Sequence, residues 1–330
     1  MSKTYKVVGI GNAVSDVIAQ ASDTFLDHMG IEKGIMQLIE RERAEVLYAA
    51  MDGRTETPGG SVANTIAGLG TLGIKSAFVG RVADDALGRT YARTLADEGT
   101  AFPNGPVEGT ALPTSRSMIF VSPDGERSMN TYLGISSEVS PDDVPTDVLA
   151  DTDYVFLEGY LFDKDPGKAA FYHAAEIAHD AGAKVGISLS DPFCVDRHRE
   201  DFRKLVSGAM DFVICNEAEL LSLYEMDDLD AALTACASEC ELVVCTCSGD
   251  GVLIKSGDTR IHVPVQEITP VDATGAGDQF AAGFLYGLVT GQTLEVAGKM
   301  GCAAAGEVIR HMGPRPVSDL RAIFAGQGLI

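Results

Sequence analysis

Residues 271–284 read Val-Asp-Ala-Thr-Gly-Ala-Gly-Asp-Gln-Phe-Ala-Ala-Gly-Phe. A glycine-rich turn leads here directly into an apolar, alanine-rich segment, which predicts a helix with Asp278 in its first turn. The amides of Gly275, Ala276 and Gly277 would then face the space before the helix, where the helix dipole is positive. The stretch therefore predicts an anion-binding hole, and Asp278 beside it could take a proton from an attacking hydroxyl group. Taken alone, the stretch also fits a plain helix start with an ordinary first-turn acid.

Short apolar segments alternate with longer amphipathic ones along most of the chain. The short segments predict strands at Tyr5–Ile10, Ser76–Val79, Tyr154–Leu157, Lys184–Ser188, Phe212–Cys215 and Leu242–Thr246. The longer segments predict helices at Ser61–Leu72, Ala86–Asp97, Lys168–Ala181, Glu217–Tyr224 and Leu229–Ser238. Right-handed crossovers join such strands into a mostly parallel sheet with helices on both faces. We therefore expect an α/β fold that binds its ligands at the carboxyl ends of the strands.

Three further regions, at about residues 14–22, 33–40 and 112–134, interrupt this alternation with extended segments. The third contains Ser-Pro-Asp-Gly-Glu at 122–126, which is typical of a hairpin turn. Pairing of these segments would form a small β-sheet that could close over the site as a lid. Because the chain has no internal repeat and no long linker, we expect residues 1–330 to form one domain with this inserted lid. The sheet edges could also pair two chains, so a homodimer stays open as an alternative to a monomer.

The charge of the chain limits its partners. Its 48 acidic and 25 basic residues give a formal charge of −23, which repels nucleic-acid phosphates and anionic lipids. We therefore expect neither a nucleic-acid nor a membrane partner. The chain starts without an apolar leader and its longest apolar stretch is too short to span a bilayer, so a cytoplasmic protein is expected.

Seven cysteines, an odd number in a long chain, favour reduced and buried thiols over a disulfide framework. Cys236, Cys240, Cys245 and Cys247 could in principle converge on zinc. Their spacing matches no standard zinc motif, so we expect them to fill small core positions.

A dinucleotide-binding loop is a competing interpretation of the first strand. Residues 9–14 read Gly-Ile-Gly-Asn-Ala-Val, and Val14 stands where the third glycine of that fingerprint belongs. A dehydrogenase is therefore disfavoured.

A sugar or nucleotide sensor without catalysis is the main alternative from another class, and the acid at position 278 argues against it, because a pure binder gains nothing from a carboxylate beside a phosphate.

The two glycine-rich segments together resemble the PfkB, or ribokinase-like, family of carbohydrate and nucleoside kinases. The Asp-x-x-Gly-Ala-Gly-Asp segment that starts at Asp272 is similar to the family's C-terminal signature. Residues 59–64, Gly-Gly-Ser-Val-Ala-Asn, followed by glycines at 68, 70 and 73, are similar to its N-terminal signature. The resemblance covers essentially the whole chain and implies a three-layer α/β/α sandwich with a mostly parallel central sheet and a small β-sheet lid.

The resemblance assigns roles on the phosphate side of the site. It implies that Asp278 is the catalytic base and that the amides of residues 275–277 stabilise the transferred phosphoryl group. Asp272 and Thr274, with the backbone near Gly313, match positions that bind a monovalent cation such as K⁺ in many relatives. For Asp272, stabilisation of the turn is an equally good explanation.

The resemblance also implies ATP and Mg²⁺ as cofactors. Asn216 and Glu219 match an Asn-x-x-Glu element that organises Mg²⁺, although a capping box at a helix start explains the same pattern. Thr246, Ser248 and Gly251 occupy the place of a Thr-x-Gly-x-x-Gly nucleotide loop. The chain departs from that pattern at Ser248, which stands where the pattern has glycine.

On the acceptor side, relatives place an Asn and an Asp like Asn12 and Asp16 on sugar hydroxyls. The Gly59-Gly60 turn and Asn64 are expected close by. Amide and carboxylate groups suit vicinal diols because together they donate and accept hydrogen bonds. Turn formation is the alternative role for Asn12 and Asp16.

Two segments of the sequence bear on the identity of the acceptor. The lid hairpin at 125–134 and the ending Met-Gly-Pro-Arg-Pro at 312–316 look most like bacterial adenosine-kinase-like proteins. This favours phosphorylation of the 5′-hydroxyl of a purine nucleoside, adenosine first. The alternative is a free-sugar kinase for ribose, fructose or a keto-deoxy sugar acid. The aromatic residues that could stack on a base are Phe102, Tyr132, Tyr160 and Phe193.

Overall fold

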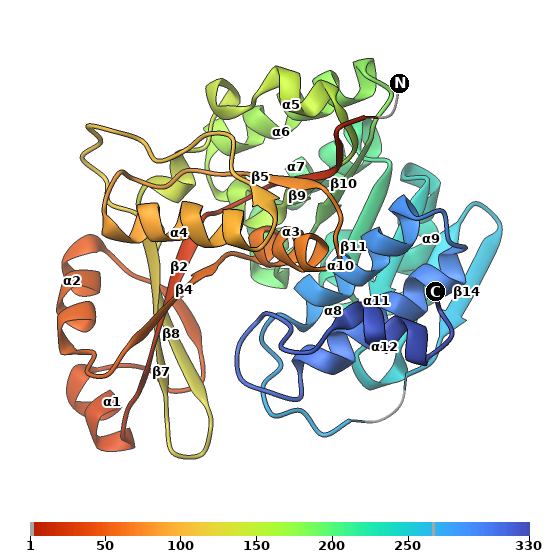
Figure 1. Cartoon of the computed structure of the whole chain (residues 1–330). Coiled ribbons are helices and arrows are strands. Elements are labelled where there is room, and N and C mark those ends of the chain that lie inside the picture. The colour runs from red at the N-terminus through yellow and green to blue at the C-terminus, as the bar shows by residue number, and fades with distance from the viewer. Residues whose placement is uncertain (1–2, 266–267) are drawn as a thin grey trace.

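The computed structural model describes residues 3–265 and 268–330, and its largest feature is a nine-stranded sheet (Figure 1). The strands follow the order β14-β13-β12-β11-β10-β9-β1-β5-β6. Their bounds are β1 Tyr5–Ile10, β5 Ser76–Val79, β6 Thr100–Ala101, β9 Thr152–Glu158, β10 Lys184–Ser188, β11 Phe212–Asn216, β12 Leu242–Thr246, β13 Val252–Ser256 and β14 Thr259–Val263. The pairs from β6 to β12 are parallel, and β13 and β14 add an antiparallel edge.

Helices cover both faces of this sheet, and each face has its own hydrophobic core. One face packs against α5 (Thr146–Ala150), α6 (Asp165–Asp180), α7 (Pro192–Ala209), α8 (Glu217–Tyr224) and α9 (Leu229–Glu239). The other packs against α3 (Ser61–Thr71), α4 (Ala86–Asp97), α10 (Ala276–Val289), α11 (Leu294–Val308) and α12 (Leu320–Gly326). The predicted α/β sandwich with a mostly parallel central sheet is confirmed.

A second, five-stranded sheet projects from the first (Figure 1). Its order is β3 (Met36–Leu38), β8 (Arg127–Tyr132), β7 (Ser115–Val121), β2 (Val14–Gln20) and β4 (Thr55–Gly59). Two helices, α1 (Asp23–Met29) and α2 (Arg41–Ala50), bury a separate core against it. The sequence predicts four of these strands. It gives no sign of β4, whose Pro58 cannot donate a backbone hydrogen bond and is tolerated here because β4 is an edge strand.

Two of the connections between the large and the small sheet are neighbours in space. Residues 11–13 connect β1 of the large sheet directly to β2 of the small one. At the second connection Gly60 joins β4 to α3 with φ = 102°, and a Cβ atom there would clash with the carbonyl oxygen of Asn12. Only glycine fits this close approach. The two connections therefore lie against each other at the carboxyl end of β1.

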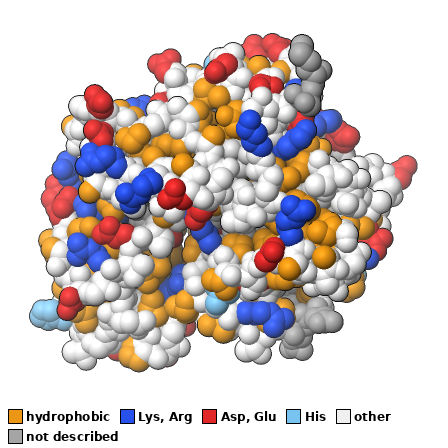
Figure 2. Space-filling view, in the orientation of Figure 1, with side chains coloured by type: hydrophobic (Ala, Val, Ile, Leu, Met, Phe, Trp, Pro, Cys, Tyr) orange, Lys and Arg blue, Asp and Glu red, His pale blue; other side chains and the backbone are white. Residues whose placement is uncertain are grey.

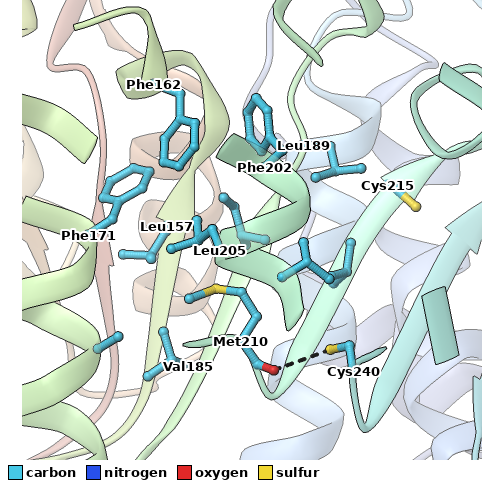
Figure 3. Packing of buried hydrophobic residues seen from close by; sticks show 14 of the residues in the cluster. Leu157, Phe162, Phe171, Val185, Leu189, Phe202, Leu205, Met210, Cys215 and Cys240 are labelled. Carbon is cyan, nitrogen blue, oxygen red and sulfur yellow. Dashed lines mark hydrogen bonds between the residues drawn. The ribbon is translucent and has the colours of Figure 1, made fainter. Parts of the chain in front are cut away.

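Aromatic side chains form the centre of the core around β9 and β10 (Figure 3). The rings of Phe162 and Phe202 stack with their centroids 4.5 Å apart. At the base of this core the Cys240 thiol donates to the carbonyl oxygen of Met210 across 3.5 Å. The cysteines predicted to be core residues are free, and Cys236, Cys240, Cys245 and Cys247 are buried. Within the described residues no three His, Cys, Asp or Glu side chains gather in a way that could hold a metal ion.

Among residues 3–265 and 268–330, no helix is both long enough and apolar enough to span a membrane.

Candidate active site

The predicted anion hole lies at the start of α10. Gly275 caps the helix with φ = 79°, and a Cβ atom on it would lie 2.5 Å from Cα of Pro314, so a side chain is excluded twice. The amides of Gly275 and Gly277 have no hydrogen-bond partner among the described residues. The amide of Ala276 instead donates to the carbonyl oxygen of Ala273 across 3.2 Å. The prediction of three free amides is therefore wrong for Ala276, because the turn before the helix uses it.

The two glycine-rich segments meet at the carboxylate of Asp278. Ser61 Oγ donates to Oδ1 across 2.7 Å, and Asn64 Nδ2 donates to Oδ2 across 3.0 Å. Thr65 Oγ1 donates to the backbone carbonyl of Asp278 across 3.0 Å. Burial raises the pKa of Asp278 to about 6, although Ser61, Asn64 and the charge of Arg315 lower it in part. At neutral pH the side chain is therefore a carboxylate in a fixed orientation that can accept a proton.

Asp16 approaches this carboxylate from β2 of the small sheet. A Cβ atom on Gly59 would clash with the Asp16 carboxylate. Glycine on β4 therefore allows the carboxylate on β2 to lie against the β4 backbone. Burial raises the pKa of Asp16 to about 7, the charges of Arg315 and Arg127 lower it, and the charge of Asp278 raises it. The two acids are therefore close enough to interact electrostatically.

Glu158, at the end of β9, holds the connection between the sheets together. Its Oε1 accepts from Asn12 N (3.1 Å) and Asn12 Nδ2 (2.9 Å), and its Oε2 accepts from Val62 N (2.9 Å). Ser136 Oγ donates to Asn12 Oδ1 across 3.1 Å. Asn12 is 4% exposed, so the protein itself engages most of its amide. Sequence reasoning missed Glu158; the available signal was a carboxylate directly after the buried run at 154–157.

The predicted monovalent-cation site already contains a positive charge. Asp272 Oδ1 accepts from Thr274 N (3.0 Å), and Oδ2 accepts from Gly313 N (2.9 Å). Arg127, at the start of β8, places its guanidinium 2.9 Å from Oδ2 and 3.2 Å from Thr274 Oγ1. The side chains of Arg127 and Asp272 are 7% and 6% exposed, so a cation at this carboxylate would face a buried like charge. The predicted residues do meet, but in this arrangement they do not fit K⁺.

Asn216 and Glu219 lie at the carboxyl end of β11 and form a complete capping box at the start of α8. Asn216 Oδ1 accepts from Glu219 N (2.8 Å), while the Glu219 carboxylate accepts from Asn216 N (3.0 Å) and Nδ2 (2.7 Å). Burial raises the pKa of Glu219 to about 7. Each carboxylate oxygen can accept a second hydrogen bond, so the pair is compatible with Mg²⁺ held through water molecules.

The predicted nucleotide loop follows the neighbouring strand, since Asn216 and Thr246 are paired across β11 and β12. Ser248 begins a 3₁₀ turn, η4 (Ser248–Asp250), with φ = 47°. Few residues other than glycine adopt this left-handed conformation. The departure from the family pattern at Ser248 therefore leaves the backbone in the conformation that a glycine would adopt. Gly251 closes the loop before β13.

A cavity of about 520 Å³ lies close to the segment that holds Asn12. It lies between the small sheet and the segment that follows β9, and Ser137 on its wall is the neighbour of Ser136, which holds Asn12. The residues that line it are Leu38, Leu133, Ser137, Tyr160, Leu161, Asp163, Lys164, Arg197 and His198.

The space-filling view shows the surface hollowed between the small-sheet lobe and the lobe of α10–α12, with acidic and basic side chains interspersed over that face (Figure 2).

The four aromatic candidates for base stacking have different positions. Tyr160 lines the cavity, and its hydroxyl donates to the carbonyl oxygen of Ser190 across 3.2 Å. Phe102 stacks on Phe78 in the core, and Tyr132 packs on the core of the small sheet. Phe193 is 72% exposed at the start of α7. The ring of Phe102 is therefore already used in packing, and stacking on a base stays a prediction for the others.

Comparison with known proteins gives the family. The pfkB family of carbohydrate kinases matches residues 31–320, and the chain belongs to that family. It is therefore a phosphotransferase that uses ATP and a small-molecule sugar or nucleoside.

Individual relatives carry names from both the sugar and the nucleoside branches. The crystal structure of a probable sugar kinase from Rhizobium etli is 45% identical, with a TM-score of 0.91 over 99% of this chain and 100% of that one. An adenosine kinase from Sinorhizobium meliloti is 46% identical, with a TM-score of 0.89 over 98% of this chain and 99% of that one. A fructokinase from Klebsiella pneumoniae is 28% identical over 71% of this chain and 77% of its own.

Proposed function

We propose that the protein transfers the γ-phosphate of ATP to the 5′-hydroxyl of adenosine. The observation that supports this acceptor is the cavity of about 520 Å³ whose wall includes Ser137, the neighbour of the Ser136 that donates to Asn12; its volume is typical of ligand pockets. Leu38, Leu133 and Tyr160 offer it apolar and aromatic surface, which suits the faces of a purine. A free sugar has no aromatic face and presents mostly hydroxyl groups, so it would cover less of such a wall. The adenosine kinase of Sinorhizobium meliloti, 46% identical, supports the same choice.

The phosphoryl transfer needs positioning and charge neutralisation more than covalent chemistry. Asp278 accepts the proton of the attacking hydroxyl, while Ser61 and Asn64 keep its two oxygens oriented. The free amides of Gly275 and Gly277 stabilise the charge on the migrating group. Mg²⁺, associated with Asn216 and Glu219, supplies neutralisation of the ATP phosphates when it is bound.

The remaining proposed contacts divide between the two substrates. Asp16 accepts hydrogen bonds from the ribose hydroxyls, and the second hydrogen of Asn12 Nδ2 donates to them. The small sheet then acts as a lid that excludes water from the reaction. The other residues assigned to binding are Gly59, Gly60 and Asn64 on the acceptor and Thr246, Ser248 and Gly251 on the nucleotide.

A free-sugar kinase is the second candidate, because the Rhizobium etli and Klebsiella pneumoniae relatives are named as kinases of sugars. The same base, amides and acidic residues would serve it. The two candidates differ in whether the cavity is filled during turnover.

The test measures ADP release from MgATP with adenosine, inosine, guanosine, ribose, fructose and keto-deoxygluconate. We expect adenosine to have the highest kcat/KM. The variant Leu133→Trp fills the cavity and should raise the KM for adenosine by about tenfold or more, with the KM for ATP unchanged. The matched control Tyr172→Leu alters an exposed aromatic residue on α6, outside the cavity, and should leave both constants unchanged. A higher kcat/KM with a free sugar would overturn the proposed acceptor.

A further inference from the structure

Arg315 belongs to the ending at 312–316, and its side chain reaches two elements far away in the chain. Its Nε donates to Asn64 Oδ1 on α3 across 3.3 Å. Its Nη1 forms an ion pair with the carboxylate of Glu98, the residue that caps the C-terminus of α4. The side chains of Arg315 and Glu98 are 17% and 27% exposed, so the pair is largely shielded from water.

The backbone beside Arg315 is also held in place. Gln279 Nε2 donates to the carbonyl oxygens of Pro314 and Asn64, each across 3.1 Å. Pro314 lies directly against Gly275, where a Cβ atom would meet its Cα. The segment that carries Arg315 is therefore fastened to both α3 and the start of α10.

This contact determines which way the amide of Asn64 points. Arginine has only hydrogen-bond donors, so the group that faces it must be Oδ1. Nδ2 then faces Asp278 Oδ2, to which it donates across 3.0 Å. A flipped amide would place donor against donor at Arg315 and oxygen against carboxylate at Asp278, which costs both hydrogen bonds.

We propose that Arg315 is a positioning residue for phosphoryl transfer: anchored by Glu98, it fixes the amide of Asn64 and thereby the orientation of the carboxylate of Asp278. The inference rests on the proposed function only in that Asp278 is the base; it holds whichever sugar or nucleoside is the acceptor.

The charge of Arg315 adds a second effect that an experiment can separate from packing. The charged groups around Asp278 are Arg315, Asp16 on β2 and Glu158 on β9. Arg315 lowers the pKa of Asp278 and of Asp16, while the charge of Asp278 raises the pKa of Asp16 and of Glu158. Without the guanidinium, Asp278 would remain protonated to a higher pH.

The test compares Arg315→Met, Arg315→Lys and Glu98→Gln with wild type by steady-state kinetics from pH 5 to 9. Arg315→Met should lower kcat by roughly 10- to 100-fold, leave the KM for ATP unchanged and move the acid limb of the kcat profile to higher pH. Arg315→Lys keeps the charge without the fork geometry, so it should restore the acid limb but not the full kcat. Glu98→Gln should lower kcat less than Arg315→Met, because the bond to Asn64 survives. Arg321→Met, at an exposed position on α12, is the matched control.

Folding is checked by the thermal midpoint and by ATP binding, so a loss of kcat with both intact reflects positioning. A wild-type kcat and an unshifted acid limb in Arg315→Met would overturn the inference, provided that Asp278→Asn is inactive in the same assay. Full activity of Asp278→Asn would instead contradict the assignment of the base in the proposed function. The two failures are therefore distinguishable.

Discussion

Glu158→Gln tests whether the buried carboxylate between the two sheets makes stability depend on pH. Glu158 is 1% exposed, and burial raises its pKa from 4.5 to about 7, against the opposing effect of hydrogen bonds from Val62 and Asn12. A group whose pKa is raised on folding contributes stability that is fully present below its unfolded pKa and lost as the pH rises through its folded pKa. The free energy of unfolding should therefore fall between about pH 4.5 and pH 8.

The magnitude follows from the difference between the two pKa values. At about 1.4 kcal/mol for each pH unit, a rise from 4.5 to about 7 corresponds to roughly 3 kcal/mol from this one residue. Glutamine does not titrate, so Glu158→Gln should remove this part of the pH dependence. The variant keeps the part of the same sign that comes from Asp16, Glu219 and Asp278, whose pKa values are also raised.

The assay is urea denaturation at several pH values between 5 and 8.5, with the difference in unfolding free energy across that range as the readout. The exposed control Glu42→Gln should reproduce the wild-type pH dependence. Lower stability of Glu158→Gln at every pH is expected as well, because one buried amide loses its acceptor. The reasoning is refuted if Glu158→Gln and wild type lose the same free energy between pH 5 and pH 8.5.

Three further predictions follow from single residues. The wild-type kcat should rise with pH through about pH 6 and then level off, because Asp278 must be ionised to accept the proton; a flat profile from pH 5 to 8 at saturating substrates would contradict this. Ser248→Gly should raise the free energy of unfolding by about 0.5 to 1 kcal/mol in urea, because glycine adopts φ = 47° without strain; an unchanged or lower value would argue against strain there. Wild type should have the same kcat and thermal midpoint in KCl and choline chloride, because Arg127 already forms an ion pair with Asp272. Arg127→Met should gain a rise in thermal midpoint that depends on KCl. A K⁺ response in wild type alone would show that the guanidinium does not block the site.

The local sequence pattern was sufficient to predict a strand where burial and strand propensity agree. Lys184–Ser188 and Leu242–Thr246 are short, apolar and β-branched, and the structure has β10 and β12 at those bounds. Central strands of a parallel sheet are buried on both faces, so their sequences carry the signal without help from distant residues.

The edges of the sheets were less predictable, because tertiary contacts decide them. β4 contains Pro58 and Gly59, which local propensity disfavours in a strand, and it forms by antiparallel pairing with β2. Its sequence also has few apolar residues that would reveal a buried face. Pairing with a neighbour, rather than propensity, makes this segment a strand.

In the candidate site, too, residues in a local motif were predictable, and residues that act across a long separation were not. The glycine-rich segments predicted Asp278 and Asn64, since a motif is visible over a few neighbouring residues. Glu158 and Arg315 were not assigned roles, because each acts across a long separation: Glu158 lies 146 residues from Asn12, and Arg315 lies 217 residues from Glu98. Such partners become visible only when the fold brings them together.

The most direct test of the central claim follows the label from [γ-³²P]ATP in a mixture with adenosine and Mg²⁺, using wild type and Asp278→Asn. The account predicts that wild type transfers the label to adenosine and forms AMP, and that Asp278→Asn binds ATP but forms almost none. Label found in a sugar phosphate when fructose or ribose competes with adenosine, or AMP formed equally well by Asp278→Asn, would contradict it.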